Sequence, residues 1–332
     1  MRKALRWIIP IALAIIFGGV VLQSVVRADF TPDHPVIFGV SFSPYYAESL
    51  GLDWRKTYLA ILDDLQVDRV RLAAYWDHLE PVDDQFNFSD LDWQMEMARK
   101  RNVGVVLTVG RKLPRWPECF DPSWLHQRSA QDQLNEVLEV VDTIVQHYRG
   151  YDNLVAWQVE NEPLVGWFGV CPDPDPTLLK REIDLVRQLD SRPIIVTDSG
   201  ELSTWWRASQ YPDILGTTMY RVVSNPWFGV WRWPLPPSYY YYKTQFIKKI
   251  HGVDRVIVSE LQAEPWSNGP ITQLPLDQAA QSFDIDQFAQ NVNFAVASGF
   301  DEVYLWGAEW WYWMKERQGV PDFWNLAKTL WQ

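Results

Sequence analysis

The sequence has 332 residues, of which 47% are hydrophobic and 22% are charged, and its formal net charge is −12 at pH 7. This balance is typical of a globular protein with enough apolar material for a full core. The acidic charge argues against a nucleic-acid partner, which would require a basic face. Twenty tryptophans and fourteen tyrosines are unusual for this length, and we expect part of this aromatic surface to line a binding cleft.

Residues 1–28 have the pattern of a signal peptide or a signal anchor. Three basic residues lie within the first six positions and precede a nearly unbroken apolar run over 7–26, which is long enough to span a bilayer. The positive flank places the N-terminus in the cytoplasm and the rest of the chain outside. Cleavage after 26–28 gives a secreted protein, and retention gives a membrane anchor. Both predict an extracytoplasmic protein, with residues 29–35 as a linker.

The rest of the chain alternates between apolar runs and stretches whose apolar residues recur at helical spacing. The length and β-branched content of the runs predict buried parallel strands, at 36–44, 67–76, 102–110, 153–163, 192–200, 214–221, 255–265 and 301–311. Helical patterns are expected at 53–65, 89–101, 130–148, 177–189, 239–251, 284–298 and 318–331. Ser89 and Asp92 are spaced as a capping box, and Gly299 is expected to end the sixth helix.

Eight alternations without a break in composition predict one closed (β/α)₈ TIM barrel over residues 36–332. A doubly wound open sheet is the structural alternative. It is weakened because no glycine-rich turn follows the first strand.

Two of the predicted strands end in a carboxylate. The fourth ends at Glu162 and the seventh at Glu260, and the chemistry of such barrels lies at the carboxyl ends of the strands. A charge at the end of a buried strand is costly unless it faces the mouth and finds partners. Glycoside hydrolysis needs such a pair, in which one carboxylic acid protonates the leaving oxygen and one carboxylate attacks the anomeric carbon or activates water.

The motifs around these two glutamates resemble those of glycoside hydrolase clan A. WQVENEP at 157–163 looks like the acid/base strand of family 5 cellulases and of family 35 and 42 β-galactosidases. The resemblance implies a barrel with Glu162 as acid/base and Glu260 as nucleophile. It also implies supporting roles for four residues. Asn161 would donate to the sugar 2-hydroxyl, and Trp306 would form the aromatic floor of the sugar site. Arg71 and Tyr220 would hold the nucleophile ionised.

The sequence departs from the family 5 pattern at two places. Thr218 stands where a histidine usually precedes the sixth-strand tyrosine. A third-strand histidine is also missing, and the loop at 111–118 reads RKLPRWPE instead. The segment 75–92 looks more like families 35 and 42.

Several further residues are candidates for the rim of the site. We expect Glu160 to lie beneath it, as a support of Glu162 or in an ion pair with a barrel arginine such as Arg71. Trp116, Trp266 and Glu309 are candidates for sugar binding, with loop packing as the alternative. Cys119 and Cys171 fall in the loops after adjacent strands, and we predict a disulfide between them. The five histidines are scattered and the two cysteines stand apart from them, so no metal or cofactor is predicted.

The sequence therefore predicts a retaining glycosidase that acts on β-linked glycosides, oligosaccharides or polysaccharides. Retention predicts carboxyl groups about 5–5.5 Å apart, and inversion predicts roughly 6.5–9.5 Å. A non-catalytic carbohydrate-binding barrel and a transglycosylase that uses the same residues are the alternatives.

Overall fold

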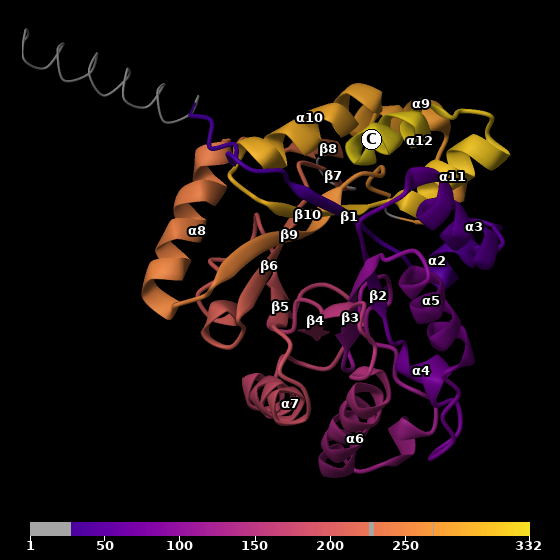
Figure 1. Cartoon of the computed structure of the whole chain (residues 1–332), viewed down its shortest axis with the longest axis vertical. Helices are drawn as coiled ribbons and strands as arrows, with labels where there is room; N and C mark the ends of the chain where they lie inside the picture. Colours follow the sequence, from indigo (N-terminus) through magenta and orange to yellow (C-terminus); the bar gives the residue numbers. More distant parts are fainter. Residues whose placement is uncertain (1–27, 226–228, 268) are drawn as a thin grey trace, which may run out of the picture.

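The computed structural model describes residues 28–332 except 226–228 and 268. Its centre is a closed barrel of eight parallel strands in the spatial order β1-β10-β9-β6-β5-β4-β3-β2 (Figure 1). In chain order, the barrel strands are β1 (Ile37–Ser41), β2 (Arg69–Ala73), β3 (Gly104–Val109), β4 (Leu154–Val159), β5 (Ile194–Asp198), β6 (Ile214–Met219), β9 (Arg255–Gln262) and β10 (Glu302–Trp306). Each lies within a predicted apolar run, so the (β/α)₈ barrel is confirmed and the open sheet is excluded.

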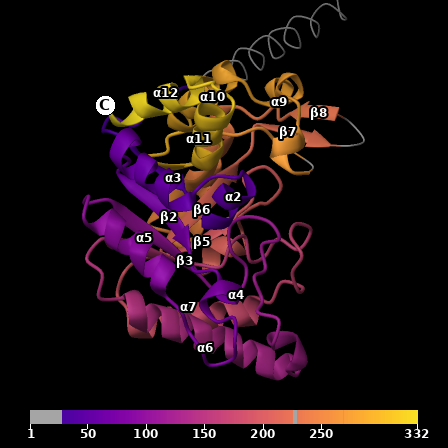
Figure 2. The same cartoon turned by 90° about the vertical axis from the view of Figure 1, so that its right-hand side faces the viewer.

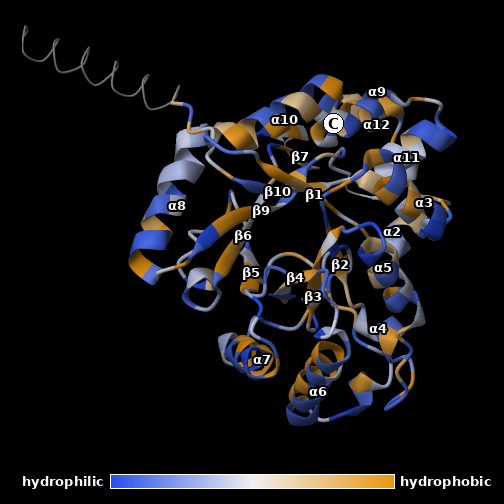
Figure 3. Cartoon of the chain, in the orientation of Figure 1, coloured by the Kyte–Doolittle hydropathy of each residue, from blue (hydrophilic) through white to orange (hydrophobic). Residues whose placement is uncertain are grey.

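Helices surround the barrel (Figures 1 and 2). They are α2 (Pro44–Ser49), α3 (Trp54–Ala60), α4 (Trp76–Leu79), α5 (Ser89–Arg99), α6 (Ala130–Tyr148), α7 (Pro176–Leu189), α8 (Pro237–His251), α9 (Leu276–Ser282), α10 (Ile285–Ala297), α11 (Ala308–Arg317) and α12 (Asp322–Lys328). Three of the long helices begin at side chains that cap free backbone N–H groups, at Ser129 for α6, Asp175 for α7 and Asp284 for α10. Their apolar faces turn toward the strands (Figure 3).

The inside of the barrel changes from apolar to polar along its axis. Val106, Ala156 and Ile195 belong to an apolar cluster in the lumen. Because side chains two residues apart on a strand share a face, the next inward layer is Thr108, Gln158 and Thr197. All three are buried and polar. The polar layer lies toward the carboxyl ends of the strands, which we call the mouth of the barrel.

The structure corrects two details of the sequence analysis. Ser89 is not a cap, because it is the first residue of α5 and its own N–H is bound by Asn87. The segment after β6, for which no element was predicted, contains a hairpin of β7 (Val222–Asn225) and β8 (Gly229–Arg232). Gly299 ends α10 in the left-handed conformation, as predicted.

The linker before the barrel packs on the outer helices. The ring of Phe30 stacks on Tyr241 of α8 at 3.7 Å between centroids, and its N–H donates to the carbonyl of Ala297 at the end of α10. The signal or anchor predicted at 1–28 lies almost entirely outside the described residues. Among the residues that are described, no helix is both long and apolar enough to cross a membrane.

Candidate active site

A register shift in β9 positions Glu260 at the mouth. On the β6 side, Thr217 pairs with Val258 and Thr218 pairs with Glu260, so one residue of β9 is extra. Such bulges redirect side chains near active sites. The carboxylate of Glu260 accepts a hydrogen bond from Arg71 Nη1 at 2.9 Å and one from the Tyr220 hydroxyl at 2.8 Å. One cation and one neutral donor therefore hold this carboxylate in place.

Arg71 connects the two carboxylate-bearing strands. Besides Glu260, its guanidinium donates to Gln158 Oε1 and to Asn161 Oδ1, both at 2.7 Å. Since the amide oxygen of Asn161 faces Arg71, its nitrogen is turned the other way, where it can donate to a bound hydroxyl. Arg71, Asn161, Tyr220 and Glu260 thus form one hydrogen-bonded group, the set that the sequence motifs predicted.

Glu162 lies next to this group in the left-handed backbone region, with a φ of 44°. Its N–H donates to Thr197 Oγ1 at 2.7 Å, and its Oε1 faces the hydroxyl of Thr218 at 3.4 Å. Burial raises the pKa of the Glu162 carboxyl well above its usual range, and the nearby charges of Glu260 and Glu118 raise it further. The protonated form of Glu162 is therefore favoured, and Thr218 stands at the position of the missing histidine.

Glu160 supports the acid/base turn from the side. Its two oxygens accept the backbone N–H groups of Arg111 and Lys112 at 2.7 and 2.6 Å. The carboxyl of Glu182 is also buried, and its pKa is raised well above its usual range by burial and then by the Glu160 charge. The expected ion pair with Arg71 is not formed. The φ of 60° at Glu160 breaks the strand alternation and turns its side chain toward the loop after β3.

That loop brings a third carboxylate and a lysine to the site, which the sequence analysis missed. Lys112 Nζ donates to the carbonyls of Glu162 and Val165 at 3.1 and 2.9 Å. It lies 3.2 Å from Glu118 Oε2. Burial raises the pKa of Glu118 to about 7, opposed by the Lys112 charge. The available signal was the charged RKLPRWPE segment itself, which follows directly from the carboxyl end of a barrel strand.

Arg115, from the same loop, was also missed. Its guanidinium donates to Glu264 Oε1 at 2.6 Å and to Glu309 Oε2 at 3.2 Å. It lies 3.6 Å from the ring centre of Tyr46 and 3.9 Å from that of Trp306. One face of Trp306 is thus covered by a cation. Glu309 is fully buried and both its oxygens are bonded within the protein, to Arg115 and to the N–H of Ser43, which favours the packing role.

A row of aromatic rings begins at Tyr220. Trp266 lies 5.5 Å from Tyr220, Phe168 lies 6.3 Å from Trp266, and Trp116 lies 6.1 Å from Phe168, between ring centroids. Trp116 is 66% exposed. The predicted disulfide between Cys119 and Cys171 is present, with 5.3 Å between the Cα atoms. It joins the two loops that carry Trp116 and Phe168.

Comparison with known proteins gives a family match. Residues 32–226, more than half of the chain, match the model for Cellulase (glycosyl hydrolase family 5). The chain is 24% identical over 189 residues to β-galactosidase BgaA of Clostridium cellulovorans. That alignment covers 48% of this chain and 28% of BgaA, so the chain spans well under a third of that relative.

Solved structures show the same fold at low identity. The GH5_18 protein of Bifidobacterium longum subsp. longum in complex with Manβ1-4GlcNAc superposes with a TM-score of 0.59 and 14% identity, over 82% of this chain and 68% of that one. The β-galactosidase of the psychrophilic Marinomonas ef1 superposes with a TM-score of 0.55 and 13% identity, over 81% of this chain and 53% of that one.

Proposed function

The chain belongs to glycoside hydrolase family 5, and from this premise we propose that it is a retaining β-glycosidase with Glu162 as acid/base and Glu260 as nucleophile. One observation carries the assignment. Two buried carboxyl groups at the mouth stand in opposite environments. Glu260 is bound by a cation and a hydroxyl donor, whereas burial and neighbouring charge favour the protonated form of Glu162.

The first step of the proposed reaction forms a glycosyl-enzyme. Glu162 donates its proton to the glycosidic oxygen as that bond to the anomeric carbon breaks, and Glu260 Oε attacks the same carbon. The leaving group departs as an alcohol, so no charge builds up on it. Asn161, held by Arg71, donates to the sugar 2-hydroxyl during this step.

The second step uses the same two residues in reversed roles. Once Glu260 is an ester it carries no charge, so one of the causes that raise the pKa of Glu162 disappears. Glu162, now ionised, takes a proton from water, and the water oxygen attacks the anomeric carbon. Glu260 leaves as a carboxylate, and the sugar is released with its original anomeric configuration.

The substrate class follows from the family and the rim. We propose β-linked oligosaccharides or polysaccharides, because the exposed rings of Trp116 and Phe168 and the half-buried ring of Trp266 offer flat faces for sugar rings next to Tyr220. We also propose an extracytoplasmic location, either secreted or held by residues 1–28. The disulfide supports an oxidising compartment.

A screen of 4-nitrophenyl β-glycosides followed by trapping tests the proposal. The protein should cleave at least one of these glycosides, and proton NMR should show the β-anomer first. The matching 2-deoxy-2-fluoro glycoside should label Glu260, as peptide mass mapping would show, and Glu260→Ala should be inactive. Release of the α-anomer first, or a label on another residue, would refute the mechanism.

A further inference from the structure

The contact between Arg115 and Glu264 crosses the whole mouth of the barrel. Arg115 follows β3 and Glu264 follows β9. In the strand order, β3 and β9 are four places apart in a closed ring of eight, so they stand on opposite sides of the barrel. A hydrogen bond of 2.6 Å between the two side chains therefore bridges loops from opposite walls. We call Arg115, Glu264 and Glu309 the latch.

Two aromatic rings, a tyrosine hydroxyl and a backbone N–H contact the latch residues. Tyr46 and Trp306 flank the guanidinium. The remaining oxygen of Glu264 accepts from the Tyr46 hydroxyl at 2.8 Å, and that of Glu309 accepts from the Ser43 N–H at 2.6 Å. The Arg115 side chain is only 11% exposed. Separating the cation from its two buried carboxylates would leave buried charges without partners, so the bridge persists in the free protein.

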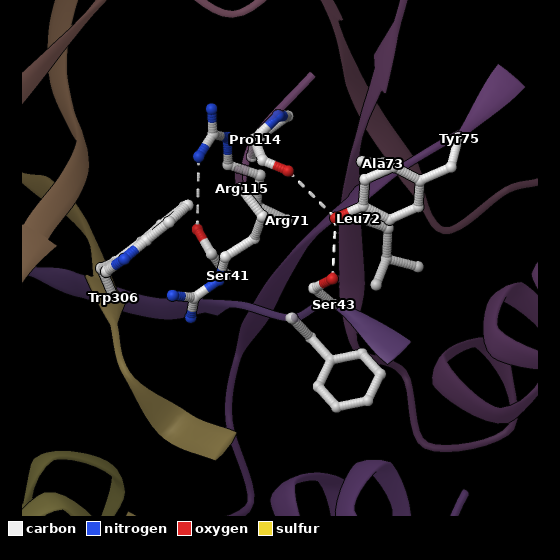
Figure 4. Close-up of a pocket in the computed structure, with 10 residues that line it drawn as sticks. Ser41, Ser43, Arg71, Leu72, Ala73, Tyr75, Pro114, Arg115 and Trp306 are labelled. Carbon is white, nitrogen blue, oxygen red and sulfur yellow. Dashed lines mark hydrogen bonds between the residues drawn. The ribbon is translucent and has the colours of Figure 1, made fainter. Parts of the chain in front are cut away.

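The space under the latch is too small for a sugar. The cavity there has a volume of about 10 Å³, which is near the least that holds one water molecule. It is lined by residues of β1, β2, β10 and the loop after β3, among them Ser41, Arg71 and Tyr75 (Figure 4). The cavity beside the latch is thus about the size of a water molecule.

The closed side lies away from the acid/base. Glu162 stands at the end of β4, and it protonates the oxygen of the departing group, so the departing part of the substrate extends toward β4. The sugar that forms the glycosyl-enzyme then points the other way, toward the latch. The exposed ring of Phe168 belongs to the loop after β4, the strand toward which the departing part extends.

We propose that the latch makes the site a blind pocket that admits one sugar unit, so that the protein removes single units from non-reducing ends. This inference rests on the proposed glycosidase function and adds the mode of action. An enzyme that cuts within a chain needs room on both sides of the broken bond. Here the latch occupies the side away from Glu162, and Glu162 and Glu260 are just 8% and 4% exposed.

Product analysis tests the mode of action. The probes are β-1,4-linked pentasaccharides of glucose, mannose, xylose and galactose, each labelled with 2-aminobenzamide at the reducing end. At low conversion, the only labelled product should be the tetrasaccharide, together with a free monosaccharide. Labelled disaccharide or trisaccharide among the first products would overturn the proposal while leaving the glycosidase function intact.

A binding measurement tests the blind pocket if none of the pentasaccharides is cleaved. Glu260→Gln protein is titrated by calorimetry with glucose and mannose pentasaccharides whose non-reducing end is free or capped by a 4,6-O-ethylidene group. A blind pocket predicts that the cap abolishes binding, and equal binding of both forms would overturn it. If neither form binds and no aryl glycoside is cleaved, both the mode of action and the glycosidase proposal fail.

A latch variant ties the effect to these residues. Arg115→Ala with Glu264→Gln and Glu309→Gln removes all three charges together, so no buried charge is left without a partner. Its folding is checked by circular dichroism. We expect internal cleavage products and binding of the capped sugar to appear, and Arg99→Ala on the outer face of α5 should cause neither. A folded latch variant that still yields only tetrasaccharide would show that the latch does not close the pocket.

Discussion

Arg71 and Glu260 lie 189 residues apart in the sequence and are joined by a hydrogen bond of 2.9 Å from Nη1 to Oε1. Their side chains are only 1% and 6% exposed. Because another nitrogen of the same guanidinium binds Asn161, this ion pair also fixes the residue that precedes the acid/base. The position of the nucleophile and the position of the 2-hydroxyl donor therefore depend on one side chain.

Arg71→Met should abolish most activity and destabilise the fold. The variant leaves Glu260 buried without its cation, which costs about 3–5 kcal/mol, and kcat/KM should fall by about 10²–10³ as a preorganised charge is lost. Urea unfolding and steady-state kinetics measure the two effects. The double variant Arg71→Met/Glu260→Gln should regain much of the stability and none of the activity. Equal stability of the single and double variants would contradict this account of the pair.

Glu162→Gln should affect substrates according to their leaving groups. Loss of general-acid catalysis should lower kcat/KM by about 10²–10⁴ for sugar or alkyl leaving groups. A 2,4-dinitrophenyl glycoside needs no proton to depart, so its glycosylation rate should change little. Azide should restore turnover by replacing the base-activated water. Glu139→Gln, on the exposed face of α6, is the matched control, and a uniform loss across leaving groups would argue against the role of Glu162.

Glu118→Gln should move the alkaline limb of the pH profile. The charge of Glu118 helps to raise the pKa of Glu162, and its removal also leaves the nearby Lys112 charge unopposed. Both changes favour ionisation of Glu162. Because activity needs Glu162 protonated, the alkaline limb of kcat/KM should shift to lower pH. An unchanged limb in a folded variant would mean that Glu118 does not act on the acid/base.

Glu182→Gln should make the stability of the folded protein less sensitive to high pH. The pKa of Glu182 is raised in the folded protein, whereas a glutamate in the unfolded chain has a pKa of about 4.3. Between these two pKa values, Glu182 is protonated only in the folded state. Its contribution to stability is complete below the unfolded pKa and is lost as the pH rises through the folded pKa. Glutamine keeps a donor toward Glu160 without ionising. Melting temperatures from pH 5 to 10 should therefore fall less for Glu182→Gln than for the wild type, whereas Glu139→Gln should follow the wild type.

The strands and most helices could be predicted because the burial of each element leaves a pattern of apolar residues within its own segment of the sequence. Each barrel strand is an apolar run between polar segments, and the pattern over 130–148 matches α6 at both ends. The motifs that contain Arg71, Asn161 and Tyr220 could be assigned because each lies in or directly after its own strand. Closure of the barrel then brings those ends together, whatever the lengths of the loops between them.

The latch and the hairpin could not be predicted because they leave no local pattern of burial in the sequence. Arg115 finds its partners 149 and 194 positions away, and no local pattern selects a partner across the mouth. The direction of Glu160 depends on a left-handed backbone angle that few non-glycine residues adopt. The hairpin β7–β8 is an exposed excursion whose β8 side chains all face solvent, so it lacks the burial signal that marks a strand.

The linker has a consequence for how the protein is oriented on a surface. The chain enters β1 at its amino end, opposite the mouth, and Phe30 fastens it to α8 and to the end of α10. Residues 29–36 can extend at most about 25–30 Å. An anchor in residues 1–28, as proposed, would hold the barrel close to the bilayer with its mouth facing outward. Such an enzyme would meet glycans that arrive from the surroundings rather than the headgroups of its own membrane, and the hairpin that follows β6 would point away from the lipid.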